Sequence, residues 1–521
     1  MKQKEQIGFH YGAGILLISA VAVKIIGALF KIPIASDYCL TDRGFGYFSY
    51  AYDFFTPFYT IAMSGFPVAL AQIVAKRNSE NGGGEAAFFS ARRLFERIGI
   101  VFSGLVLLLV AVLALLGKSS SWILPVVSIT PAAFFCSAMS SYRGYYEGFG
   151  DMKPTAVSEL LEASGKLILG FSFAYFTVKL TGNYAWGATA SMLGISLGTA
   201  VAYCYLRNSF RKRNRAWRTA GTPLRERDDP ALRRTLVGIA LPVTLAALSV
   251  NMVPLIDAIT AQATLGADLY GLRAKAYTLY NLVPSFSVLL AVSAVPAVAH
   301  SVSVGEKGSL RRNVRTVFKF SALLSFPMAA GLIAASGGVM DLLYGSGDSV
   351  LIGGKLLRIF GFSAFFTGLA IPMTGILQAI GKQKRALYHI FAGASLKILL
   401  NCLLIRLPSV HVYGTAYATL ACYFCIFVLH GFTLVREVDG FLPDAAVCLK
   451  PLLASAACGV TAWALLLISS RKAVTLLAIT AAVFVYFLLL ILLKSLSVEE
   501  LPEPLQDNCL VKFCMKHRIF R

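Results

Sequence analysis

Two lysines lie within and just after the first apolar segment of this chain, where an isolated membrane helix would carry no charge. The segment runs from about 9 to 30, with Lys24 near its middle and Lys31 directly after it. They are seven residues apart, so at 3.6 residues per turn both project from nearly the same helix face. A lysine facing lipid at bilayer depth costs about 2.5 to 3.5 kcal/mol, so we expect Lys24 in a hydrated, protein-lined cavity, as on a substrate or ion pathway.

Two simpler interpretations of these lysines stay open. Lys24 could pair with a carboxylate and only link two helices. Lys31 lies at a helix end, where a long basic side chain can extend its ammonium to the membrane surface.

Further charged and polar residues lie within other apolar segments. Glu159, Glu162 and Lys166 follow helical spacing and share a face, and Glu162 precedes Lys166 in the order that favours an i,i+4 ion pair. A structural salt bridge and a substrate role are both open for this group. The other candidates at depth are Asp53, Asp257, Arg273, Lys275, Lys397 and Asn401.

The composition indicates which elements must position these residues. The 521 residues are 57% hydrophobic and 14% charged, with a mean hydropathy of +0.69, which is typical of a polytopic membrane protein. An all-α fold of about fourteen transmembrane helices follows from apolar windows of about 20 residues. The predicted spans are 9–30, 46–74, 93–116, 122–142, 156–178, 184–206, 236–263, 277–302, 314–337, 356–380, 386–405, 412–434, 447–469 and 473–493.

The net charge of +22 resides mainly in short loops between these spans. Most of the 48 lysine and arginine residues fall on one side if the N-terminus is cytoplasmic, as the positive-inside rule requires. Both termini are then expected in the cytoplasm of a multi-pass cell-membrane protein. The basic run 207–234 is expected to contact anionic membrane lipids rather than nucleic acid, although a regulatory partner stays open.

An internal repeat divides the chain. Phe134, Phe135, Gly144, Glu147, Gly150 and Lys166 recur at an offset of 231 as Phe365, Phe366, Gly375, Gln378, Gly381 and Lys397, and Ser64–Pro67 matches Ser293–Pro296 at an offset of 229. Six spans in each repeat predict two six-helix lobes in a parallel pseudo-twofold arrangement, followed by two C-terminal helices. The predicted parts are the N-terminal lobe 1–207, a basic linker 208–235, the C-terminal lobe 236–436, two further spans in 437–496 and a cytoplasmic tail 497–521. Gly150 and Gly381 should form matching turns.

Catalytic, metal and cofactor motifs are not evident. The six histidines lack metal-ligand spacing and no GxxxxGK[ST] sequence occurs. An enzyme would need catalytic residues on an outer loop or a buried histidine pair, and the sequence indicates neither. We therefore expect no catalytic residue, no cofactor and no bound metal.

Four motifs resemble a known family. They are Lys24–Pro33, Gly44–Tyr52, Ser64–Ala71 and Tyr142–Ala156. They are similar to the stage V sporulation protein B group of polysaccharide exporters, related to the MurJ-type lipid II flippases in the multidrug/oligosaccharidyl-lipid/polysaccharide exporter superfamily. The resemblance implies two six-helix lobes, alternating access and an undecaprenyl-pyrophosphate-linked sugar as cargo.

The resemblance also suggests substrate-binding residues. Lys24 falls where the MurJ-type proteins have a first essential arginine, and Lys31 lies within one residue of their second. Leu279 stands in place of their arginine in the eighth span, with Arg273 and Lys275 about one to two turns earlier. By resemblance, these cations would hold the pyrophosphate and the spans 447–469 and 473–493 would form a groove for the prenyl tail. We expect Lys24 to share a central cavity with Arg273 or Lys275.

These observations favour a monomeric flippase for lipid II or a related peptidoglycan precursor, in cell-wall synthesis or sporulation. A cation-coupled multidrug exporter of the same fold is the second hypothesis, but such exporters need acidic pockets for cationic drugs.

The resemblance raises one question about the coupling ion. Some MurJ-type proteins bind sodium between the seventh and eleventh helices, but here the eleventh offers Lys397 and Asn401 without an acid. We predict that the Lys397 ammonium replaces sodium and pairs with Asp257, because each charge alone at depth would be costly. Transport would then be independent of sodium. The alternative is that Lys397 contacts the cargo phosphate.

Overall fold

The computed structural model describes residues 2–81, 84–115, 121–213, 230–345, 347–439, 446–469, 471–493 and 495. Every regular element within these ranges is a helix. The chain divides into two compact units, Met1–Gly271 and Leu272–Arg521, which we describe separately.

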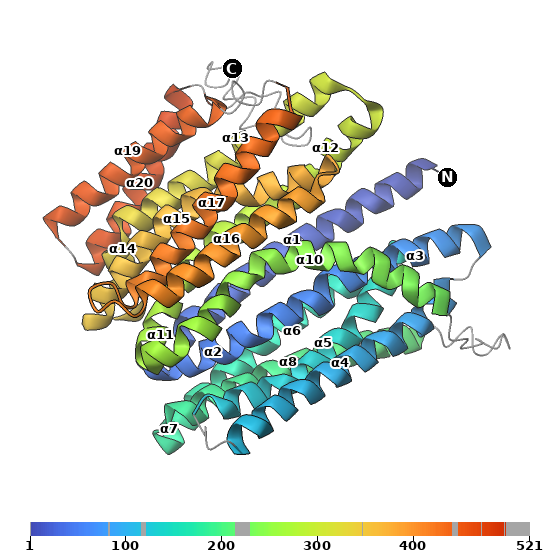
Figure 1. Cartoon of the computed structure of the whole chain (residues 1–521), viewed down its shortest axis with the longest axis horizontal. Coiled ribbons are helices and arrows are strands. Elements are labelled where there is room, and N and C mark those ends of the chain that lie inside the picture. Colours follow the sequence, from blue (N-terminus) through green and yellow to red (C-terminus); the bar gives the residue numbers. More distant parts are fainter. Residues whose placement is uncertain are drawn as a thin grey trace. The chain divides into compact units, whose positions relative to one another are not determined.

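The first unit contains the helices of the N-terminal half (Figure 1). They are α1 (Lys2–Ile34), α2 (Thr41–Thr60), η1 (Ile61–Gly65), α3 (Phe66–Asn81), α4 (Gly84–Leu115), α5 (Ile123–Gly148), α6 (Lys153–Gly165), η2 (Lys166–Gly170), α7 (Phe171–Thr181), α8 (Tyr184–Arg213), α10 (Pro230–Thr260) and the start of α11 (Gln262–Tyr280). Both η1 and η2 are π-helices. Helix α5 packs against α4 and α8, and α1 packs against α6.

The second unit begins within α11. Its other elements are α12 (Leu282–Val304), α13 (Lys307–Ala334), α14 (Ser336–Tyr344), α15 (Asp348–Ala379), α16 (Gln383–Leu404), α17 (Tyr413–Glu437), the 3₁₀ helix η3 (Ala446–Cys448), α19 (Leu449–Ile468) and α20 (Lys472–Leu492). Helix α17 packs against α15 and α16, and α19 packs against α20 and α13.

Helices α2, η1 and α3 form one membrane-length stretch that is irregular in the middle. Pro57 removes one backbone donor. The hydroxyl groups of Thr56, Thr60 and Ser64 each donate to the carbonyl oxygen four residues earlier, a pattern that often bends helices. The π-helix η1 follows directly, and such π-bulges are frequent at functional sites.

The second π-helix is fixed by close packing of small residues. Gly165 lies against Gly198 of α8, where a Cβ atom on Gly198 would be 2.9 Å from the Gly165 Cα. Gly170 and Gly194 are similarly close. Small residues let membrane helices approach closely, and here they hold the backbone of η2, which begins at Lys166.

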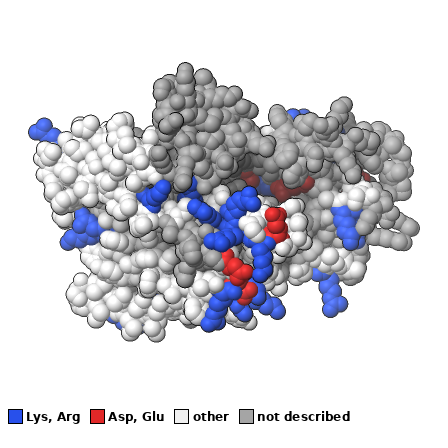
Figure 2. Space-filling model, turned by 90° about the horizontal axis from the view of Figure 1, so that it is seen from above, with Lys and Arg blue, Asp and Glu red and all other residues white. Residues whose placement is uncertain are grey.

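The all-helical, multi-pass membrane fold expected from the sequence is confirmed. Eleven helices in the described ranges are long and apolar enough to cross a membrane. The other three predicted spans fall on α6–η2–α7, α10 and α12, and the count of fourteen stays a prediction. Large apolar side chains such as Leu108 (61% exposed) and Phe484 (69%) face outward. Much of the described surface in Figure 2 is formed by residues other than Lys, Arg, Asp and Glu.

The two glycine turns have the same geometry. Gly150 and Gly381 have φ values of 75° and 78°. In each turn the glycine N–H donates to the carbonyl three residues earlier and the next N–H donates to the carbonyl five residues earlier. This matches the hydrogen bonding of a left-handed helix C-cap, so the two glycine motifs of the repeat share the same local backbone turn.

Each of these turns carries an ion pair, but the acidic and basic partners are exchanged between the two units. Asp151 follows Gly150 and accepts from Arg213 at the end of α8, at 3.2 Å. Lys382 follows Gly381 and pairs with Glu437 at the end of α17, at 3.0 Å. Each pair connects the turn to the last residue of a neighbouring helix, although the charges are exchanged.

We expect Gly150→Ala and Gly381→Ala each to destabilise the protein by about 1–2 kcal/mol, because a Cβ atom is strained at positive φ. Gly104→Ala is the matched control, since Gly104 lies within α4 with nothing within 4 Å of its added Cβ. The unfolding midpoint of the purified protein in detergent measures the effect. Equal midpoints for the turn variants and the control would contradict the strain.

The compact units do not coincide with the predicted lobes. Helix α10 begins the second repeat by sequence, but it packs against α2, η1 and α3 in the first unit. The contact is close, because a Cβ atom on Gly65 would meet Thr244 and the Ala240 carbonyl. The lobe boundaries stay a prediction. Residues 214–229 of the linker, the tail from 496 and the side chains of Ser293–Pro296 lie outside the described residues.

Candidate functional site

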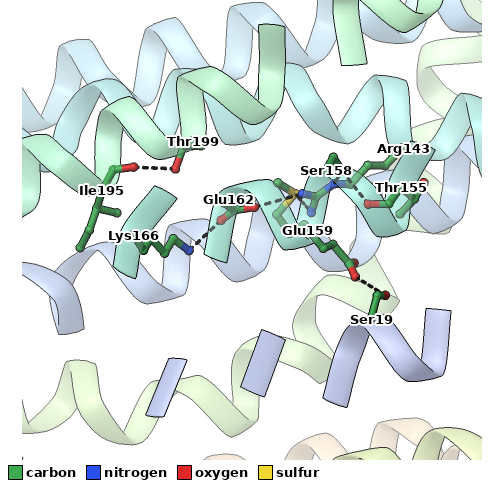
Figure 3. Close-up of polar contacts among 10 residues, drawn as sticks. Ser19, Arg143, Thr155, Ser158, Glu159, Glu162, Lys166, Ile195 and Thr199 are labelled. Atoms are coloured by element: carbon green, nitrogen blue, oxygen red, sulfur yellow. Dashed lines mark hydrogen bonds and ion pairs between the residues drawn. The ribbon is translucent and has the colours of Figure 1, made fainter. Parts of the chain in front are cut away.

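A buried network of charged side chains lies in the first unit (Figure 3). Arg143 of α5 donates from Nη2 to Glu162 Oε2 of α6 at 3.0 Å, and Lys166 Nζ lies 2.7 Å from Glu162 Oε1. Arg143 also donates from Nε to the Ser158 hydroxyl at 3.0 Å. The carboxylate of Glu162, 2% exposed, therefore lies between two cations. The contact between Glu162 and Lys166 is the i,i+4 ion pair that their spacing favours, while the substrate role left open for this group stays a hypothesis.

Glu159 extends this network towards α1. Its Oε2 lies 3.1 Å from the Ser19 hydroxyl (Figure 3). The ammonium of Lys166 lies 5.0 Å from the centre of the Tyr59 ring, close to the irregular part of α2. These contacts connect α1, α2, α5 and α6 through polar and charged side chains.

The two candidate lysines follow Ser19 on α1 and are more exposed than Arg143 and Glu162 of the network. Lys24 is exposed and Lys31 is partly exposed. The two ammonium groups are close enough to repel each other, which agrees with their predicted common face. Lys31 Nζ also lies 4.5 Å from the centre of the Tyr52 ring.

Two further acidic candidates of the first unit are buried. Asp53 accepts a hydrogen bond from the Tyr270 hydroxyl at 2.8 Å, which connects α2 to α11. Close packing supports this connection, because a Cβ atom on Gly46 would meet the Ala267 carbonyl. Asp257 of α10 is fully buried.

The candidates of the second unit are all buried. Arg273 and Lys275 of α11 have no exposed surface. The Arg273 guanidinium lies 4.8 Å from the Tyr277 ring centre, and Lys275 Nζ lies 5.3 Å from that of Tyr344. Such contacts with aromatic faces stabilise desolvated cations.

Lys397 and Asn401 of α16 are also fully buried. Lys397 Nζ donates to the Thr419 hydroxyl of α17 at 2.8 Å. Asp257 belongs to the first unit and Lys397 to the second, so their predicted ion pair, and the sodium independence it implies, stay predictions. The shared cavity predicted for Lys24 with Arg273 or Lys275 stays a prediction for the same reason.

Two features were missed by the sequence analysis. Arg143 is included only within the motif Tyr142–Ala156, yet its guanidinium contacts both Ser158 and Glu162 of the network. A buried histidine pair was not expected, but His389 Nδ1 and His430 Nδ1 lie 3.0 Å apart, and His430 is fully buried. The expectation was wrong because the pair joins two helices and has no short sequence spacing.

Comparisons with known proteins match this chain to two protein families and to individual relatives. A family described as "Polysaccharide biosynthesis protein" matches residues 10–302, and one described as MatE matches residues 242–403. The lipid II flippase MurJ of Bacillus subtilis is 23% identical over 465 residues, covering 82% of this chain and 83% of that protein. Stage V sporulation protein B of the same organism is 24% identical over 444 residues, covering 82% and 84%.

A solved structure of the lipid II flippase MurJ in an inward closed conformation has the same fold. Its TM-score is 0.65 at 15% sequence identity, covering 91% of this chain and 98% of that one. The function named for both MurJ proteins is that of a lipid II flippase, which is not an enzyme activity.

Proposed function

Because this chain belongs to the polysaccharide biosynthesis protein family, we propose that it moves an undecaprenyl-pyrophosphate-linked saccharide across the cytoplasmic membrane by alternating access. Family and fold identify a membrane flippase or exporter rather than an enzyme. The cargo is lipid II or a related peptidoglycan precursor, and the protein acts as a monomer with both termini in the cytoplasm.

One observation carries the choice of an anionic cargo. Lys24 and Lys31 are seven residues apart in α1, so their ammonium groups project from nearly the same helix face. Repulsion between like charges raises the energy of the empty site, and a pyrophosphate removes it by placing negative charge beside both. Lysine binds phosphate as a point charge without the fixed fork of arginine, so a variable saccharide beyond the pyrophosphate is compatible with this site. Arg273 or Lys275 would complete the site from the second repeat.

The multidrug exporter hypothesis is the alternative, and the MatE match supports its fold. A cationic drug needs an ionised acid that is free to bind it. Glu162 is already shared by Arg143 and Lys166, and Asp53 accepts from Tyr270. The contacts of Glu162 and Asp53 therefore favour the anionic cargo.

Flipping of fluorescent lipid II in reconstituted vesicles tests the proposed function. A prenyl-monophosphate sugar and a cationic dye are the comparison cargos. We expect lipid II to be flipped at least about tenfold faster than the monophosphate, as one lost charge-assisted contact of about 1.5–3 kcal/mol implies. Transport of the dye without flipping of lipid II would support the exporter instead.

A further inference from the structure

A ladder of contacts joins α16 and α17 in the second unit. Every fourth residue of α16 from Arg385 to Lys397 contacts α17. The polar contacts are Arg385 with Glu437 at 2.9 Å, His389 with His430 at 3.0 Å, and Lys397 with Thr419 at 2.8 Å. Between them, Gly393 packs so closely that an added Cβ atom would be 2.6 Å from Ile426 Cγ1. The histidines therefore lie where the two helices approach closely. The functional site described above does not use them.

The hydrogen bonds define the tautomer of each histidine. The Thr374 hydroxyl donates to the Ala370 carbonyl at 2.9 Å, so its oxygen is left to accept from His430 Nε2–H, also at 2.9 Å. A neutral His430 then has its lone pair on Nδ1. His389 must donate its Nδ1–H to that lone pair, so the basic nitrogen of the pair is His389 Nε2.

This arrangement accepts one proton and resists a second. A proton on His389 Nε2 gives an imidazolium that still donates through Nδ1 to His430. The bond becomes charge-assisted, which is roughly twice as strong as a neutral one. A proton on His430 Nδ1 would place two N–H donors against each other and break the bond.

The charged residues around the pair leave the positive charge of an added proton uncompensated. On α16, Arg385 precedes His389 by one turn and, with Lys382, already shares Glu437 of α17. Lys397 lies two turns further along α16, next to Thr419. On α15, the side chain that contacts the histidine pair is Thr374. The nearest charged residue before Thr374 in α15 is Arg358, about four turns earlier and roughly 24 Å away along the helix.

We propose that His389 and His430 form a binding site for a single coupling proton. This inference rests on the proposed function, because it assigns the ion that drives cargo movement. The proton enters at His389 Nε2, which belongs to the partly exposed member of the pair. By strengthening the link between the two rings, it holds α16 more firmly to α17. Proton release loosens the same two helices, so occupancy of the site changes the packing of the second repeat.

Nitrogen NMR of ¹⁵N-histidine protein in lipid vesicles tests the site without any cargo. The chain has six histidines, so difference spectra of His389→Gln and His430→Gln identify both rings. We expect Nδ1–H on His389, Nε2–H on His430, a coupling between the two Nδ1 atoms, and one bound proton per pair on acidification. His300→Gln, which removes an exposed histidine of α12, should leave these signals unchanged. Two rings that titrate independently would overturn the proposal.

Flipping under an imposed pH gradient, in sodium-free buffer, tests the coupling. One proton per cargo should change the steady distribution of lipid II about tenfold per pH unit. His389→Gln should still flip lipid II but lose this response, and His300→Gln should keep it. Wild-type flipping that ignores the gradient would overturn the coupling alone. If the wild type moves no prenyl-linked cargo, the proposed function is wrong. The proton site is tested separately by the NMR experiment, in which two rings that titrate independently would show that the site is absent.

Discussion

Glu162→Gln is expected to lower the stability of the protein by about 3–5 kcal/mol, because it leaves the buried Arg143 and the partly buried Lys166 without their shared carboxylate. Both cations contact this one side chain, at 3.0 and 2.7 Å, and Glu162 is 2% exposed. The measurement is thermal unfolding in detergent. The midpoint should fall on the order of 10 °C for a unit of this size.

A second substitution separates the effect of charge from that of packing. Glu162→Gln combined with Lys166→Met removes one of the two uncompensated cations, so the double variant should be more stable than Glu162→Gln alone. Asp439→Asn is the control, since its ion pair with Lys307 is exposed on both sides and should contribute little. If Asp439→Asn lowers the midpoint as much as Glu162→Gln, burial is not the cause.

Hydropathy and local spacing predicted the parts of this structure that depend on short stretches of chain. Apolar windows located the spans, because backbone groups in a bilayer must be paired within helices. The i,i+4 spacing predicted the ion pair of Glu162 with Lys166. The turn at Gly381 followed from the turn at Gly150, because a left-handed backbone position selects glycine wherever it recurs.

Contacts between helices were harder to predict, although one signal was available. Counted in residues along the chain, Arg143 and Ser158 are nearly equally far from the turn at Gly150. In the same way, His389 and His430 are nearly equally far from the connection between α16 and α17. Antiparallel neighbours pair in this way around a short connection. Applied to the buried polar residues, this pairing would have found both contacts.

The π-helices and the placement of α10 had no comparable signal. The break at η2 depends on how Gly165 and Gly170 contact α8, which no spacing within 156–178 reveals. Helix α10 packs with the first unit although the repeat assigns it to the second. Tertiary packing decided both.

Lys24→Ala is expected to reduce flipping of lipid II by about 10- to 100-fold, the loss of one charge-assisted phosphate contact of roughly 1.5–3 kcal/mol. Its fold should be retained, because Lys24 is exposed and its removal relieves repulsion with Lys31. Fluorescent lipid II in reconstituted vesicles gives the rate, and the unfolding midpoint verifies the fold. The rate should fall while the midpoint holds or rises.

Two control variants connect this loss to the charge of Lys24 at its position on α1. Lys24→Arg keeps a cation and should retain most of the activity, since guanidinium also binds phosphate. Lys179→Ala removes an exposed lysine of α7 that contacts the Tyr175 ring, and flipping should be unchanged. A Lys24→Ala protein that flips lipid II at the wild-type rate would exclude Lys24 from the pyrophosphate site.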